Sequence, residues 1–206
     1  MVFSIHSKLL FLGIAVGITY GASAAEPLPI SLDAESSSFD RQANTVVFKR
    51  LTITQGDMVI RAAEAVAQGL DFEQGEWRFS GQVSFAVENA SIEADSATIT
   101  FTANALQTAE LVGTPARFVQ VIEDSAEPLS GGANTLSYDN VARIMRMLGD
   151  AWFQQGPNEF RGCDLIYDLD QEQITSGSSD CGQPIVITIL PRTEDDNDPG
   201  ETTSSP

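Results

Sequence analysis

Two cysteines, Cys163 and Cys181, have the most clearly defined chemistry in this 206-residue sequence. The loop between them contains 17 residues. In an oxidising compartment such a pair can form a disulfide, for which the loop-closure model gives about 3 kcal/mol of stabilisation. The alternative is a pair of buried thiols. We expect the disulfide, because the N-terminal region described below predicts export.

Carboxylates are the other side chains that could carry out catalysis. The only histidine is His6, which lies in a segment that we expect to be removed. Without histidine, the chain has neither a nucleophile activated by imidazole nor a histidine-ligated zinc site. Paired carboxylates about 5 to 9 Å apart could still hydrolyse glycosides, but Glu93, Asp95, Asp139 and Glu159 show no spacing that predicts such a pair. We therefore predict no catalytic residue, no metal ion and no cofactor.

The charge balance argues against nucleic acid as a partner. Eleven basic and 29 acidic residues give a formal charge of −18, which repels phosphate backbones. A hydrophobic content of 42% is sufficient for one folded domain. Residues 193–206 contain no hydrophobic side chain, so we expect a disordered acidic tail there.

Residues 1–25 have the pattern of a cleavable signal peptide. Lys8 precedes an apolar run at residues 9–20, and small residues follow at positions 21–25. The alternative is a membrane anchor, but this run of 12 residues is shorter than the roughly 20 that a helix needs to span a bilayer. The pattern predicts an exported chain that is cleaved after Ala24 or Ala25.

The rest of the sequence predicts antiparallel β-structure. Residues 45–54, 91–101 and 184–190 are rich in β-branched and aromatic side chains with a period of two. Turn signals recur too often to leave room for crossover helices, so neighbouring strands should pair antiparallel. Residues 56–69 could compete as a helix because they include several alanines, but the neighbouring segments favour a strand.

The sequence also repeats itself. The tripeptide Ser-Phe-Asp at residues 38–40 returns as Ser-Tyr-Asp at residues 137–139, and in both places a turn, an apolar strand and Gln-Gly follow. Serial antiparallel units of one kind predict an elongated, stacked β-architecture.

Several short motifs follow one another in order between residues 29 and 191. They are Pro-Ile-Ser-Leu-Asp-Ala-Glu at 29–35, Thr-Val-Val-Phe at 45–48, Leu-Thr-Ile-Thr-Gln-Gly at 51–56, Gly-Thr-Pro-Ala-Arg-Phe at 113–118, Ala-Asn-Thr-Leu-Ser-Tyr-Asp at 133–139 and Gly-Asp-Ala-Trp at 149–152. In these motifs the chain resembles the OstA-like domain of lipopolysaccharide-transport proteins, and most of all the periplasmic bridge component of that family.

The resemblance implies both a fold and a role. Residues 26–192 would form an all-β domain, a twisted, V-shaped antiparallel β jelly roll of two sheets with open ends. The chain would carry lipopolysaccharide through the periplasm from the inner to the outer membrane. Its partners would be LptC and LptD at the two ends, together with further copies of itself joined head to tail.

Open sheet ends also follow from the physics of strand edges, because unpaired backbone groups there can accept another strand. We expect residues 30–34 and 185–190 to form these edges. If the two sheets diverge, apolar residues that face inwards leave a groove for acyl chains, and the alternative is an ordinary sandwich core. The candidates are Ile30, Leu32, Phe39, Phe118, Leu136 and Tyr138.

Three other functions remain open at this point. One is an inner-membrane-associated component similar to LptC, against which the cleavable signal argues. The others are a secreted glycoside-acting enzyme that uses carboxylates and a secreted sugar-binding β-sandwich.

Overall fold

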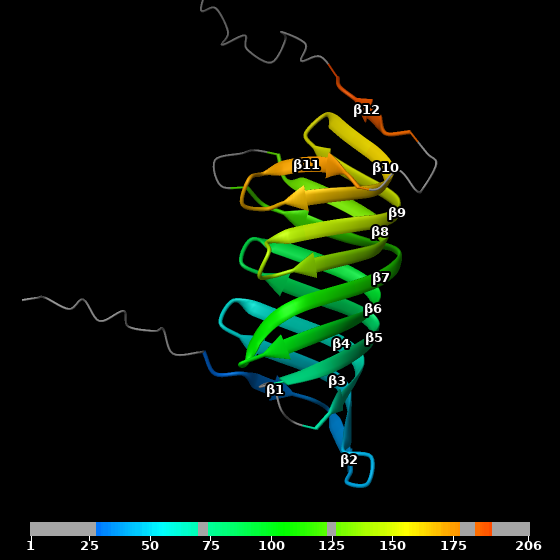
Figure 1. Ribbon diagram of the computed structural model, residues 1–206. Coiled ribbons are helices and arrows are strands. Elements are labelled where there is room, and N and C mark those ends of the chain that lie inside the picture. Colours follow the sequence, from blue (N-terminus) through cyan, green and yellow to red (C-terminus); the bar gives the residue numbers. More distant parts are fainter. Residues whose placement is uncertain (1–27, 70–73, 123–126, 178–183, 191–206) are drawn as a thin grey trace, which may run out of the picture.

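Long antiparallel strands, stacked one upon the next, make up the described part of the chain (Figure 1). The computed structural model describes residues 28–69, 74–122, 127–177 and 184–190. Within these ranges no helix is long and apolar enough to cross a membrane. The elements of the described residues are antiparallel strands, which confirms the all-β prediction. The strands are β1 (Ser31–Asp33), β2 (Ser36–Asp40), β3 (Thr45–Gln55), β4 (Met58–Gln68), β5 (Gln74–Val87), β6 (Ala90–Thr102), β7 (Ala105–Gln120), β8 (Leu129–Asp139), β9 (Ile144–Gln155), β10 (Asn158–Asp168), β11 (Gln173–Ser176) and β12 (Val186–Thr188).

The strands form one unclosed sheet in which each long strand pairs with the next along the chain. Each end of the sheet is shared by two short strands. β1 and β2 both pair with β3, whereas β11 and β12 both pair with β10. β1 and β12 thus lie at the ends expected from the sequence, and β2 and β11 complete those ends.

The segment at residues 56–69 contains a strand, β4 (Met58–Gln68), as we expected. Ala65 and Ala67 of β4 are buried opposite Phe79 and Trp77 of β5 on the same face of the sheet. Small side chains leave room there for large rings, and this packing outweighs the helix propensity of alanine.

The sheet bends along a line through the middle of its strands. β-bulges or irregular pairing interrupt the ladders near that line, and such bulges bend a strand and increase its twist. On the same line Arg50, Gln82 and Asp150 have positive φ angles of 49°, 53° and 49°. The interruptions fall at residues 61–64 of β4, 80–83 of β5, 93–96 of β6, 112–116 of β7, 132–135 of β8 and 162–164 of β10.

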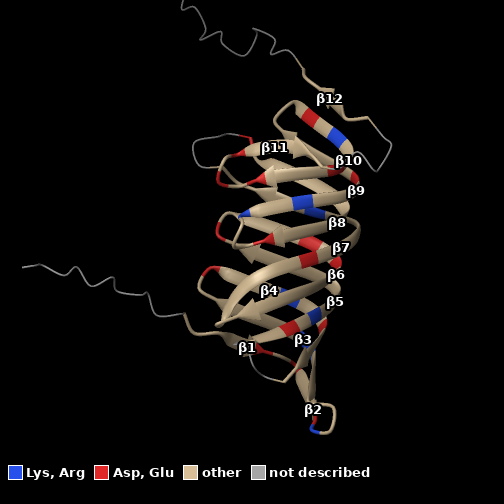
Figure 2. Ribbon diagram, viewed as in Figure 1, with Lys and Arg blue, Asp and Glu red and all other residues tan. Residues whose placement is uncertain are grey.

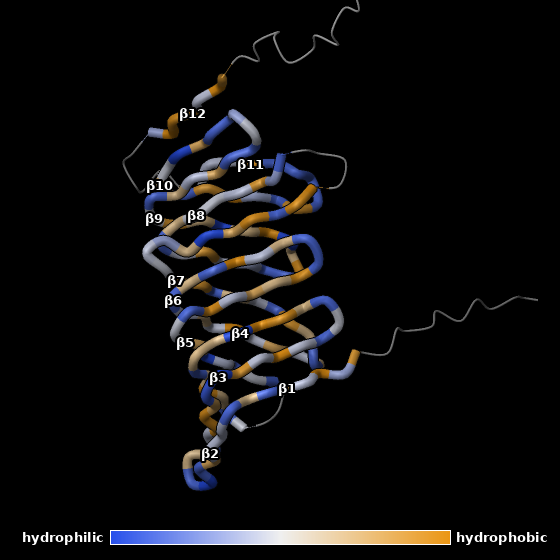
Figure 3. The backbone as a smooth tube through the Cα atoms, turned by 180° about the vertical axis from the view of Figure 1, so that it is seen from behind, coloured by the Kyte–Doolittle hydropathy of each residue, from blue (hydrophilic) through white to orange (hydrophobic). Residues whose placement is uncertain are grey.

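The bend divides the sheet into two halves that face each other. Phe153 and Tyr167 show this directly, because their ring centroids lie 5.1 Å apart although they belong to different halves. Apolar side chains from both halves form the core, while hydrophilic residues alternate with them along the strands (Figure 3). Half I comprises residues 31–33, 51–62, 83–94, 115–120, 129–133, 151–162 and 186–188; half II comprises residues 36–49, 64–68, 74–80, 96–112, 135–148 and 164–176.

One type of turn occurs three times in half II. The carboxylates of Asp40, Asp139 and Asp168 each accept hydrogen bonds from the backbone N–H groups two and three positions further on. Such Asx turns hold a chain reversal without help from the core. Each aspartate follows an aromatic residue, and each turn ends in a residue with a positive φ angle, namely Asn44, Arg143 or Glu172. The repeat detected in the sequence corresponds to the first two of these turns.

Three of the sequence predictions concern residues outside the described part of the chain. They are the signal peptide at residues 1–25, the acidic tail at residues 193–206 and the position of Cys181. Cys163 lies in β10. The disulfide to Cys181 therefore stays a prediction.

Candidate functional site

A cavity of about 280 Å³ lies between the two halves on the side opposite the bend. Both halves contribute to its lining, and we call the open side, where their turns approach each other, the mouth. The inner wall is apolar. It is formed by Met58, Phe85, Ile92 and Phe118 of half I and by Leu106 and Met145 of half II.

Polar groups surround the mouth. The side-chain amide of Gln55 donates hydrogen bonds to the backbone oxygens of Leu28 at 3.1 Å and Asn104 at 2.9 Å. Gln55 ends β3 in half I, and Asn104 lies in the β6–β7 turn of half II. One side chain therefore joins the two halves across the mouth.

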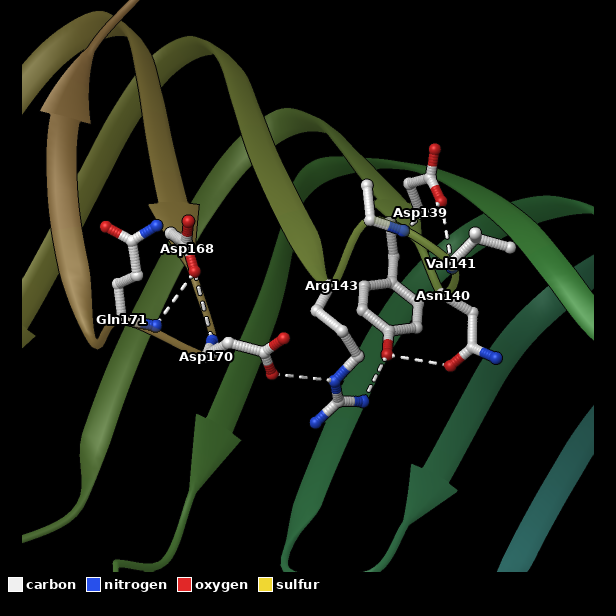
Figure 4. A network of polar contacts seen from close by, with 9 residues as sticks. Asp139, Asn140, Val141, Arg143, Asp168, Asp170 and Gln171 are labelled. Atoms are coloured by element: carbon white, nitrogen blue, oxygen red, sulfur yellow. Dashed lines mark hydrogen bonds and ion pairs between the residues drawn. The ribbon is translucent and has the colours of Figure 1, made fainter.

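A second polar network stands on the half II side, in the turns after β8 and β10 (Figure 4). The Tyr138 hydroxyl donates to Asn140 Oδ1 at 2.9 Å and accepts from Arg143 Nη1 at 2.8 Å. Arg143 Nε also points to Asp170 Oδ1 at 3.4 Å, a long contact. The network holds the guanidinium of Arg143 at the edge of the apolar wall.

The protonation state of Arg143 follows from these neighbours. Partial burial acts to lower the pKa of its guanidinium, but the Tyr138 hydroxyl and the Asp170 carboxylate outweigh that effect and raise the pKa above its ordinary value. Burial, with the nearby carboxylates of Glu172 and Asp168, also raises the pKa of Tyr167. The cavity therefore presents a permanent cation, Arg143, and a neutral Tyr167.

The residues expected to line a groove occupy different places. Phe118 and Tyr138 line the cavity from opposite halves. Leu136 is fully buried in the core, while Ile30 and Leu32 are half-buried and pack against it. Phe39 is 52% exposed at the end of the sheet. Its cross-strand neighbour Val46 faces the core, so Phe39 lies on the inner face of the sheet too.

Several lining residues could not be selected from the sequence. Met58, Leu106 and Met145 occupy ordinary strand positions, and only the packing of one half against the other brings them to one cavity. Arg143 lies in a turn. The aromatic residue followed by aspartate predicts that turn, but it does not predict that Arg143 lines a cavity.

The candidate carboxylates do not gather into one site. Glu93 and Asp95 line a separate polar pocket of about 380 Å³ near the bend, where Asp95 accepts a hydrogen bond from Thr114 Oγ1 at 3.1 Å. Asp139 caps its turn, and Glu159 forms an ion pair with Arg161 at 2.7 Å. Within the described ranges, no three histidine, cysteine or acidic side chains are grouped so that they could hold a metal ion.

Comparison with known families places this fold. Residues 63–173, more than half of the chain, match the family described as "LptA/(LptD N-terminal domain) LPS transport protein". The chain belongs to this family. The resemblance seen in the sequence is thereby confirmed.

Individual relatives agree with this lipopolysaccharide transport family. The lipopolysaccharide export system protein LptA of Escherichia coli (strain K12) is 26% identical over 176 residues, which cover 84% of this chain and 78% of that protein. LptA of Haemophilus influenzae is 24% identical over 190 residues, which cover 90% of this chain and 92% of that protein. The crystal structure of LptH, described as the LptA homologous periplasmic component of the lipopolysaccharide transport device from Pseudomonas aeruginosa, has a TM-score of 0.43 and 18% identity, and the match covers 80% of this chain and 96% of that one.

The region that matches the transport family contains most of the cavity. Gln55 and Met58 lie before it, while the remaining lining residues fall between positions 63 and 173. The candidate site is thus built mainly from the part of the chain that defines the family.

Proposed function

We propose that this chain carries lipopolysaccharide through the periplasm and holds its acyl chains between the two halves of the bent sheet. The observation that carries the proposal is the apolar cavity with a polar mouth, to which Phe118 and Tyr138 contribute from opposite halves. Membership of a lipopolysaccharide transport family supports it, and so do relatives named as lipopolysaccharide export proteins.

The energetics favour an acyl chain over a polar ligand. Each methylene moved from water to an apolar wall contributes about 0.8 kcal/mol. At about 280 Å³ the cavity lies just below the range of roughly 300 to 1,000 Å³ that is usual for ligand pockets. A lipid with several chains therefore requires the halves to separate further at the mouth, while its sugar and phosphate groups remain in solvent.

The two ends of the sheet suit head-to-tail assembly. Since pairing is antiparallel throughout, β12 runs opposite to β1, and β11 runs opposite to β2. One end could thus continue the sheet of a second copy, with half I joined to half I and half II to half II. Both ends also expose apolar residues on their inner faces: Phe39 is 52% and Ile187 is 53% exposed, and Ile187 lies opposite Phe160.

We place the chain between partners of the same transport system, with LptC and LptD as the binding partners at its ends and further copies between them. Backbone pairing would supply affinity, and the apolar inner faces would supply register. In this role the chain performs no catalysis, since transport requires only that the lipid is held and passed on.

Equilibrium binding tests the proposed function. Purified chain without the signal segment is titrated with lipopolysaccharide and with the same molecule after removal of its acyl chains. We expect saturable binding of the first and none of the second. Equal binding of both would show that the sugar is recognised, and the transport groove would then be the wrong assignment.

A further inference from the structure

In each of the three Asx turns, the last residue has a positive φ angle. This position is Asn44 in the first turn, Arg143 in the second and Glu172 in the third, with φ angles of 47°, 56° and 50°. Asparagine adopts this left-handed conformation easily, whereas a long side chain such as arginine does so at a cost. Glu172 bears the same cost in the third turn, so a reason for the arginine must come from its side chain and not from the turn itself.

The position of its side chain offers that reason. Arg143 and Glu88 are the charged residues of the cavity lining, and they stand on opposite halves. Tyr138 holds the Arg143 guanidinium by the hydrogen bond to Nη1, and the side chain is still 42% exposed. Among the described residues Nη2 has no hydrogen-bond partner, so two N–H donors remain available at the mouth.

Arg143 is the basic residue of the cavity lining, and its ion pair is weak. The chain is strongly acidic, and acidic residues recur in its turns (Figure 2). Lys49, Arg50, Arg78, Arg146 and Arg161 form ion pairs with carboxylates away from the cavity. The ion pair of Arg143 is the longest of those found, at 3.4 Å, and its carboxylate partner Asp170 is 68% exposed. An incoming anion can replace so weak a contact.

We propose that Arg143 binds an anionic phosphate of the lipid head group while the acyl chain enters the cavity below it. Guanidinium and phosphate match in shape and charge, and such hydrogen bonds are stronger than neutral ones. Tyr138 and Asn140 orient the guanidinium, and Glu88 on the opposite half disfavours an anion on that side. This inference rests on the proposed function and adds to it a determinant of head-group position.

The test compares two lipids and four forms of the protein. The probes are lipid A with its phosphates and the same lipid after their removal, and the proteins are wild type, Arg143→Gln, Asp170→Asn and Arg117→Gln. We expect Arg143→Gln to weaken binding of the phosphorylated lipid about tenfold and to leave the dephosphorylated lipid unaffected. Asp170→Asn should strengthen binding of the phosphorylated lipid, because it frees the guanidinium. A merely structural role of Arg143 would not produce that gain.

Arg117→Gln is the matched control. Arg117 is also an arginine, but it lines the separate polar pocket near the bend and not the cavity. Arg117→Gln should change neither the affinity for the phosphorylated lipid nor the affinity for the dephosphorylated lipid. Inorganic phosphate alone should not displace the lipid at millimolar concentration; displacement with an affinity equal to that of the lipid would mean that free phosphate is the ligand.

The outcomes separate the two proposals. If wild type binds neither lipid, the proposed function is wrong. If it binds both with equal affinity, or if Arg143→Gln weakens both equally, the groove stands and the phosphate site at Arg143 is overturned.

Discussion

The side-chain amide of Gln55 lies 2.9 Å from the backbone oxygen of Asn104, although 49 positions separate the two residues in the chain. This hydrogen bond crosses the mouth from half I to half II. A second N–H of the same amide reaches the oxygen of Leu28. The mouth is therefore held together at this end by polar contacts, which an opening motion would have to break.

Replacement of Gln55 by alanine should loosen this end of the mouth. The loss of the hydrogen bonds should cost about 1 kcal/mol of unfolding free energy and speed amide hydrogen exchange in the β6–β7 turn. Gln154→Ala is the control, because within the described residues the Gln154 side chain bonds locally, to the oxygen of Gly156 at 3.1 Å. Unchanged exchange around Asn104 in the Gln55→Ala variant would show that the contact does not restrain the mouth.

Two adjacent glycines allow the cavity to be altered from opposite faces of one strand. A methyl group on Gly131 would lie 2.3 Å from the Phe118 ring, whereas one on Gly132 would lie 2.8 Å from Trp152 Nε1. Since Phe118 lines the cavity, Gly131→Ala should push its ring into the space that we assign to the lipid.

Both substitutions should destabilise the fold by about 1 to 3 kcal/mol through overpacking. Gly131→Ala alone should also weaken lipopolysaccharide binding, measured by equilibrium titration of the folded variants. A loss of affinity that is the same in Gly132→Ala would separate the cavity from lipid binding.

The sequence predicts the strands well because their signal is local. Residues 45–54 and 91–101 alternate in hydrophobicity, and the structure has β3 and β6 there. The bend has a weaker signal: Gly81 and Gly149 have positive φ angles beside Gln82 and Asp150, but Arg50 adopts one with no glycine next to it. The position of the bend determines which inward-facing side chains of half I contact those of half II.

The candidate site shows the same limit. Phe118 and Tyr138 could be chosen because they are aromatic residues in recognisable motifs, and both line the cavity. Leu136 looks equivalent in the sequence, yet it packs into the closed core beside Leu111 and Met147. Gln55 ends β3 and Arg143 lies in a turn, and contacts with distant turns, to Asn104 and Asp170, reveal their place at the mouth.

The disulfide prediction is tested by counting thiols. Chain isolated from an oxidising compartment should show no free thiol after denaturation, because Cys163 and Cys181 pair. Cys163→Ser should then lower the unfolding free energy by about 2 to 4 kcal/mol, as measured in denaturant. Two titratable thiols in the unreduced protein would exclude the pairing.

Assembly depends in our account on the exposed strand edges. Truncation before Gln183 removes β12, so it should shift the chain to a monomer at concentrations where the full mature chain grows in mass. Removal of residues 192–206 alone retains β12 and serves as the control, which should leave assembly unchanged. Light scattering over a concentration series measures the mass of both truncated proteins and of the full mature chain. A full-length chain that stays monomeric throughout and binds no truncated relative of its transport system would contradict head-to-tail bridging.

Site-specific photo-crosslinking tests the central claim most directly. A photoreactive residue is placed at Phe118 or Tyr138 inside the cavity, or at Trp152, which lies over Gly132 on the other face of the sheet. With the folded protein saturated with lipopolysaccharide, we expect covalent lipid adducts at positions 118 and 138 and none at position 152. Adducts at position 152 alone, or none at either cavity position, would show that the acyl chains do not lie between the two halves.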